Sequence, residues 1–336
     1  MDVIFELSFI WAGLIAFAVL TYVVLDGFDL GVGILFPFAH SRKDRDTMMN
    51  SVAPIWDGNE TWLVLGGGGL FAVFPLAYAV VMSALYMPII LMLLALVFRG
   101  VAFEYRWKTE RWKRVWDIAF FGGSTMAALC QGIALGALVQ GIKVTERHYS
   151  GGWWDWLTPF TLLTGVAVVV GYALLGATWV MMKTDGAVHH RMRDLAKPLA
   201  IATLAFIAAV SIWTPFQNYT YFERWFAMPG FLYTLPIPVL LAIAIYTLFT
   251  GLARGHDVTP FLSSMALFVI SFIGIGISFY PNIVPPSLSI VDAAAPDASL
   301  KFALVGTSVL IPLILAYTAY AYWVFRGKLD PENGYH

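Results

Sequence analysis

Four carboxyl groups lie in strongly apolar surroundings near the N-terminus. Asp26 and Asp29 lie in YVVLDGFDLGVGILF, and Asp57 and Glu60 lie in APIWDGNETWLVLGGGGLF. Each pair has i, i+3 spacing, which places both side chains on one face of a helix. Carboxyls at membrane depth are costly and are retained mainly where they pair or handle ions or protons. The two pairs therefore predict a path for protons or cations.

The same acids have a structural alternative, in which they cap helices and meet basic groups. The run Asp57-Gly58-Asn59 is typical of a helix cap. Arg99 and Glu104 end an apolar run in VFRGVAFEYRW. We expect Arg99 either to pair with one of the acids or to reach the membrane surface as an ordinary snorkelling arginine. Both alternatives stay open at this point.

The composition requires a membrane around the chain. Apolar residues make up 60% of the 336, and charged residues only 12%. That proportion is typical of an all-α polytopic membrane protein and exceeds what a soluble core of this size can bury. The net charge of -1 indicates no nucleic-acid partner.

Apolar segments of about 20 residues match the hydrocarbon thickness of a bilayer. The sequence predicts nine such spans, at about 8–36, 59–79, 82–103, 117–141, 159–182, 199–216, 231–253, 260–280 and 302–325. A weak internal symmetry suggests two four-helix units, at 1–142 and 159–282, with a peripheral helix at 302–325. The acidic motifs belong to the first unit.

Basic residues are concentrated in alternate connections between the predicted spans. Fifteen of the 20 Lys and Arg lie in five segments: 40–50, 104–116, 183–198, 254–259 and 326–336. The positive-inside rule places these segments in the cytoplasm, which requires nine spans, an outside N-terminus and a cytoplasmic C-terminus. All four acids then lie toward the cytoplasmic side, as a funnel that admits protons or cations would require.

Two further patterns concern packing and cofactors. Four consecutive glycines, Gly66, Gly67, Gly68 and Gly69, are expected to let a neighbouring helix approach closely, although such a run can also unwind. Haem in a membrane protein is usually held by His or Met within a span. The six histidines all lie outside the predicted spans, at His40, His148, His189, His190, His256 and His336. We therefore expect no haem on this chain, and redox cofactors mainly on a partner.

Several motifs are similar to one family. LDGFDLGVGIL (25–35), NSVAPIWDGNETWL (50–63), FRGVAFEYR (98–106) and GATW (176–179) resemble subunit II of cytochrome bd-type quinol oxidases, including the cyanide-insensitive type. The resemblance covers the whole chain in length, order and hydropathy.

The resemblance implies a fold of two four-helix bundles plus a peripheral helix. It also implies a heterodimer in the bacterial cytoplasmic (inner) membrane with a subunit I that carries haem b, haem d (or a further haem b) and the quinol site. Such an oxidase oxidises quinol, reduces dioxygen to water and takes protons from the cytoplasm. Subunit II binds no haem in this family. Some members hold a structural quinone there, and a small single-helix accessory subunit is a further partner.

The resemblance also implies roles for particular residues. Asp57 matches the acid of the WDGN motif, and Glu104 matches a position where other members can have Asp; both are candidate relay carboxyls. Asp26 and Asp29 match the DGFD pair and would complete the proton entry, with Glu60, or help to hold a cation at Asp29 and Asp57. Trp56 and Trp62 match the aromatic positions around WDGN and are expected to be structural, as Arg99 and the glycine run are from their own residue types.

Two other functions fit the bare sequence features. One is a stand-alone proton- or cation-coupled transporter, which typically has its site near the midplane on broken helices. The other is a purely structural subunit whose acids only pair or cap. The position of the acids toward one side favours the oxidase subunit over the transporter.

Overall fold

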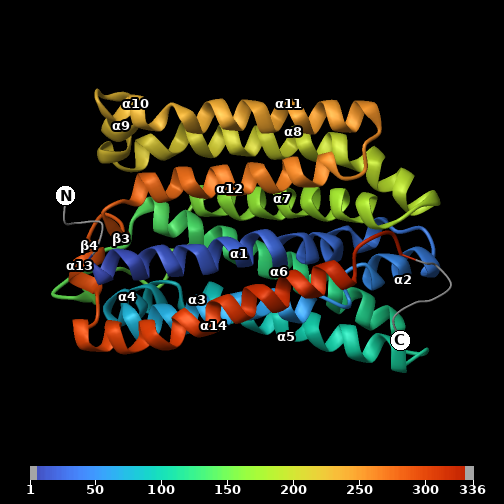
Figure 1. The fold of residues 1–336 in the computed structure, drawn as a ribbon, viewed down its shortest axis with the longest axis horizontal. Coiled ribbons are helices and arrows are strands. Elements are labelled where there is room, and N and C mark those ends of the chain that lie inside the picture. Colours follow the sequence, from blue (N-terminus) through green and yellow to red (C-terminus); the bar gives the residue numbers. More distant parts are fainter. Residues whose placement is uncertain (1–5, 330–336) are drawn as a thin grey trace.

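Most of the chain folds into long apolar helices that lie roughly side by side (Figure 1). The computed structural model describes residues 6–329. In this part of the chain, eight helices are long and apolar enough to cross a membrane. They are α1 (Leu7–Leu35, extended by the 3-10 helix η2, Phe36–Phe38), α5 (Tyr86–Lys108), α6 (Lys113–Gln140), α7 (Pro159–Lys183), α8 (Gly186–Gln217), α11 (Pro236–Arg254, continuous with the short α10, Gly230–Thr234), α12 (Thr259–Phe279) and α14 (Asp297–Val324).

The remaining predicted span is a broken helix. Helices α3 (Trp56–Val73) and α4 (Pro75–Ala84) are bent by 120° where they meet. Pro75 lacks a backbone N–H and disfavours helical geometry at the residue before it, so Phe74 leaves the helix with φ -131° and ψ 60°. The prediction of one continuous span over 59–79 is therefore wrong beyond Val73. The 18 residues of α3 reach about 27 Å, close to the hydrocarbon thickness.

Short elements connect the long helices. One end of the bundle carries α2 (Arg42–Asn50), whose first turn is held by a capping box between Ser41 and Asp44. The other end carries the remaining short elements (Figure 1). These are α9 (Tyr219–Phe226), α10 (Gly230–Thr234), α13 (Ile290–Ala293) and two antiparallel hairpins, β1 (Val144–Thr145) with β2 (His148–Tyr149) and β3 (Asn282–Val284) with β4 (Leu288–Ser289).

The five basic segments, as far as residue 329, gather at the end of the bundle that carries α2, called here the basic end (Figure 1). Ion pairs join the segments to one another. They are Arg106–Asp46, Arg42–Glu110, Arg191–Asp44, Lys328–Asp185 and Lys328–Asp257. The segment 326–336 is described only to residue 329, and His336 lies outside the described residues.

One of these segments does not form the predicted loop. Helix α8 begins at Gly186, so most of 183–198 is helical. His189 lies on this helix and is buried. Its Nδ1 is 2.9 Å from the carbonyl oxygen of Met181, and its Nε2 is 3.6 Å from Asp257. Both histidines of the pair thus lie on a helix rather than in a connection between spans, with His189 buried and His190 exposed, because a short turn reverses the chain before them.

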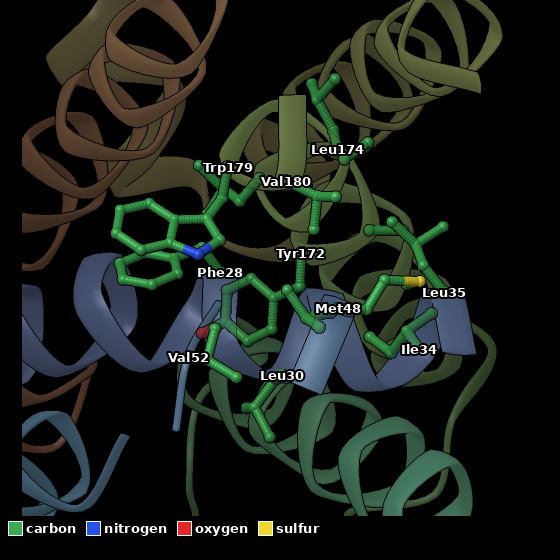
Figure 2. Close-up of a cluster of buried hydrophobic side chains, with 14 of the residues drawn as sticks. Phe28, Leu30, Ile34, Leu35, Met48, Val52, Tyr172, Leu174, Trp179 and Val180 are labelled. Carbon is green, nitrogen blue, oxygen red and sulfur yellow. The ribbon is translucent and has the colours of Figure 1, made fainter. Parts of the chain in front are cut away.

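Helix α1 lies at the centre of the bundle and packs on α3, α6 and α7. Near its basic end, the ring of Phe28 stacks on the indole of Trp179, with centroids 4.2 Å apart, and meets Phe261 edge-on (Figure 2). Helix α14 lies along α1 and α3 and remains largely exposed. The division into units at 1–142, 159–282 and 302–325 stays a prediction; α1 and α6 both pack on α7 across the proposed boundary.

Two glycines from the motifs explain the closest helix contact. A Cβ on Gly31 would lie 2.7 Å from the backbone nitrogen of Gly176, and a Cβ on Gly176 would lie 2.3 Å from the carbonyl carbon of Gly31. Both neighbours are backbone atoms, which cannot move aside without separating the helices. The DGFDLG and GATW motifs therefore meet where α1 crosses α7.

We predict that Gly176→Ala destabilises the protein by about 1–3 kcal/mol, the usual range for overpacking. The matched control is Gly122→Ala on α6, where an added Cβ meets no atom within 4 Å. Because alanine favours helix over glycine, the control should keep or raise stability. Thermal unfolding in detergent measures both variants, and equal melting temperatures would contradict the contact.

Candidate functional site

Asp26 and Asp29 lie in the half of α1 that leads to η2 and the basic end. Both side chains are fully buried. Their i, i+3 spacing directs them to one side of α1, where α3 and α5 bring partners. The two acids lie in the last third of α1, toward the basic end, and their position toward the cytoplasmic side stays a prediction.

Arg99 of α5 is the only cation that reaches these acids among the described ion pairs. Its Nη1 lies 3.1 Å from Oδ1 of Asp26 and 3.3 Å from Oε2 of Glu60. The Arg99 side chain has no exposed surface, and the guanidinium lies 5.8 Å from the centroid of Trp56 and 5.7 Å from that of Phe103. The snorkelling alternative is wrong. Arg99 instead joins α1, α3 and α5 through buried charge.

Asn59 of α3 is a site residue that the sequence reasoning assigned only to a cap. Its side chain is buried, and Nδ2 donates to Oδ2 of Asp29 at 2.7 Å. Its Oδ1 accepts a hydrogen bond from the hydroxyl of Tyr322 at 2.9 Å. Asn59 belongs to the WDGN motif, and this membership is the sequence feature that could have identified it as a site residue. Nothing in the sequence indicated Tyr322, which comes from the far end of the chain on α14.

A second series of hydrogen-bonded side chains leads from the acids into the bundle. The hydroxyl of Tyr172 donates to Oε1 of Gln131 at 2.8 Å, and Nε2 of Gln131 donates to the hydroxyl of Tyr22 at 2.8 Å. Tyr22 stands one helical turn before Asp26 on α1. These three residues were also missed, because isolated Tyr and Gln residues in apolar helices carry no distinctive pattern.

Charge and hydrogen bonding are unbalanced at this site. Three carboxyls, Asp26, Asp29 and Glu60, face one guanidinium, so full ionisation would leave two surplus negative charges. In the described structure, Oδ1 of Asp29 and the Nε and Nη2 atoms of Arg99 are buried without a hydrogen-bond partner, while Asp26 keeps its contact with Nη1 of Arg99. Buried polar atoms are normally satisfied by protein, water or ions. The arrangement suits a hydrated site that exchanges protons.

The two candidate relay carboxyls lie outside this buried cluster. Asp57 is exposed on α3, and Glu104 is exposed on α5, where its carboxylate is 3.6 Å from Lys108. Stacking of Trp56 on Phe103, with centroids 4.6 Å apart, brings the two helix segments together. Glu60 of α3, with a side chain 24% exposed, is intermediate in exposure between these surface acids and the buried ones.

The remaining predicted residues lie on α3. Trp62 is buried and meets Phe17 edge-on at 5.8 Å. A Cβ on Gly66 would meet Val19, and one on Gly69 would meet Ile15, so both glycines face α1. Gly67 and Gly68 have no atom within 4 Å of an added Cβ, and the helix continues through all four.

A second buried arginine was also missed. Arg106 of α5 contacts Asp46 of α2 at 2.6 Å and Asp117 of α6 at 2.5 Å. It stands seven residues after Arg99 in the FRGVAFEYR motif, on the same face of α5. The described residues contain no group of three or more His, Cys, Asp or Glu placed to hold a metal ion. A cation at Asp29 and Asp57 stays a prediction.

We predict that Arg99→Gln lowers the free energy of unfolding by about 3–5 kcal/mol, because it leaves buried acids without their cation. Combining it with Asp26→Asn should recover part of the loss, since the pair then disappears together. Arg254→Gln, an exposed arginine at the same end, is the control. Thermal unfolding measures all four proteins. If Arg99→Gln and the control have the same melting temperature, the ion pair does not stabilise the fold.

Comparisons with known proteins cover nearly the whole chain. Residues 7–325 match the family model described as cytochrome bd terminal oxidase subunit II. Cytochrome bd-I ubiquinol oxidase subunit 2 of Escherichia coli (strain K12) is 34% identical, over 97% of this chain and 96% of the relative. Cytochrome bd ubiquinol oxidase subunit 2 of Bacillus subtilis (strain 168) is 28% identical, over 96% of this chain and 97% of the relative.

A solved structure has the same fold. A chain of the bd oxidase from Geobacillus thermodenitrificans superposes with a TM-score of 0.79 at 16% identity, over 96% of this chain and 99% of that chain. The fold, the motifs and the full-length similarity agree, and the chain therefore belongs to the cytochrome bd terminal oxidase subunit II family.

Proposed function

We propose that this chain is the haem-free subunit II of a terminal quinol oxidase in the bacterial inner membrane, and that it carries part of a proton-uptake path. The family relationship over the full chain supports the oxidase assignment. One observation carries the proton path: two carboxyls, Asp26 and Glu60, share the buried Arg99 guanidinium, and Glu60 is partly exposed on the same helix as Asp57. The family relationship does not favour a stand-alone transporter.

The α3–α5 face is the proposed contact with subunit I. Its exposed acids, Asp57 and Glu104, lie on helices that are otherwise apolar enough for a membrane. Charged side chains avoid lipid and face protein or water. Gly67 and Gly68 leave open space on α3 that a partner helix could approach closely. A subunit docked on this face would enclose the two acids in an interface.

The proposed route runs from the basic end toward the buried cluster. Asp57 and Glu104 receive protons at the interface, and Glu60 passes them to the group around Arg99. One guanidinium cannot balance three ionised carboxylates, so the three carboxyls hold at least one proton among them. A proton that arrives at one carboxyl can therefore be released from another. Arg99 stays charged throughout and limits the cost of the ionised acids.

The redox groups belong to the partner in this proposal. Haem b and haem d (or a second type of haem b) reside in subunit I and supply the reduction of dioxygen to water. The chain itself supplies position and protons. A structural quinone, a small single-helix accessory subunit and a cation at Asp29 and Asp57 remain secondary parts of the proposal.

We predict that Asp57→Asn lowers quinol-driven oxygen consumption about tenfold, because proton delivery becomes limiting. The haem spectrum of the purified complex should stay unchanged. Asp57→Glu restores the carboxyl and should recover most of the activity. The control is Asp194→Asn, an exposed acid on α8 at the same end of the bundle.

Three measurements on each complex decide the outcome: oxygen consumption across pH, haem content from the optical spectrum, and subunit content on a gel. Normal turnover of Asp57→Asn in an assembled complex would contradict the relay role. Equal losses in Asp57→Asn and Asp57→Glu would also contradict it, because shape rather than the proton would then matter.

A further inference from the structure

A cavity of about 410 Å³ opens at the basic end, away from the buried acids. Its walls come from η2, α2, the turn between α5 and α6, and the first turns of α6. Apolar and charged side chains line it together. The apolar ones are Phe36, Pro37, Ile118 and Phe121.

The charged lining is strongly basic. Five cations surround the cavity, at Arg42, Arg45, Arg111, Lys113 and Arg114. Only two carboxylates oppose them, at Glu110 and Asp117. The lining thus carries a surplus of three positive charges.

The carboxylates are already engaged by other cations. Asp117 contacts the buried Arg106 at 2.5 Å and Arg45 at 3.4 Å. Glu110 lies 3.7 Å from Arg42 and 3.6 Å from Lys113. Arg111 and Arg114 form no ion pair within the described residues, although both line the same cavity. Two guanidinium groups therefore remain available for an anion.

Buried contacts just outside the cavity hold its surrounding helices together. Arg106 ties α5 to α2 and α6 through its two carboxylates, and its guanidinium lies 5.3 Å from the ring centroid of Phe36. Phe36 and Phe120 pack edge-on with centroids 4.9 Å apart. These contacts fix the positions of the helices that carry the cations of the cavity.

The apolar side of the cavity continues onto an exposed apolar surface at the start of α6. Ile118 is 62% exposed, and Trp112 and Val115 beside it are also exposed. Exposed tryptophan beside clustered arginine is typical of the level where a span meets the headgroup region. A ligand here would place an anion among the arginines and hydrocarbon along α6.

We propose that this cavity binds the phosphate of an anionic phospholipid headgroup. Guanidinium groups bind phosphate oxygens through paired hydrogen bonds, and basic pockets between membrane helices suit such headgroups. Free inorganic phosphate could make the same contacts with the arginines, but it has no hydrocarbon to pack against the apolar wall. The site is separate from the acids around Arg99 and does not depend on proton transfer there.

The test is native mass spectrometry of the purified complex, delipidated in mild detergent and titrated with cardiolipin, phosphatidylethanolamine or inorganic phosphate. Wild-type protein should bind cardiolipin in preference to the zwitterionic lipid. Arg111→Gln/Arg114→Gln should weaken cardiolipin binding about tenfold, because two headgroup contacts are lost. The matched control, Lys197→Gln/Arg254→Gln, removes two exposed cations at the same end and should leave binding unchanged.

Four results would overturn the proposal. One is equal cardiolipin binding by wild type and the Arg111/Arg114 variant. The second is equal loss in the control variant, which would reflect general charge. The third is displacement of cardiolipin by inorganic phosphate at comparable concentration, which would identify a soluble anion as the ligand. The fourth is loss of the partner subunit from the Arg111/Arg114 variant, which would make the cavity a protein interface.

Discussion

The Arg99 guanidinium is the interaction on which the rest of this structure depends. Placing two fully buried carboxyls and a third, partly exposed one in a membrane bundle is costly unless a cation is buried with them. Arg99 contacts Asp26 on α1 and Glu60 on α3 from its own position on α5. The charge thereby determines how these three helices are rotated relative to one another. Asn59 and Tyr322 extend the same network to Asp29 and to α14.

The second buried arginine extends this principle to the basic end. Arg106 stands two helical turns beyond Arg99 on α5 and joins α2 and α6 through Asp46 and Asp117. One motif thus supplies the cation for the acid cluster and the cation that fastens the end of the bundle. The apolar contacts of α1 complete the arrangement. Gly31 and Gly176 let α1 approach α7 closely, so the acids are shielded from lipid on that side.

The exposure of the acids increases from the buried cluster on α1 to the α3–α5 face. Asp26 and Asp29 are enclosed, Glu60 is partly exposed, and Asp57 and Glu104 are exposed on the α3–α5 face. A purely structural ion pair does not require acids of stepwise increasing exposure. The series fits the proposed proton entry at a subunit interface, where the partner would cover the outer acids and the buried group would store charge around Arg99.

The sequence by itself determined the membrane class, the approximate spans, the family and the gathering of basic segments at one end. These properties depend on hydropathy, charge and motifs within single segments, which can be read without knowing how helices pack. The tertiary structure decided that Arg99 is buried, that Asn59 and Tyr322 join the acids, and that Asp57 and Glu104 face outward. It also decided the bend after Val73 and the start of α8 at Gly186. Side-chain direction depends on helix rotation and on contacts between distant segments, such as Asn59 and Tyr322, which are 263 residues apart. Periodicity along one helix does not contain that information.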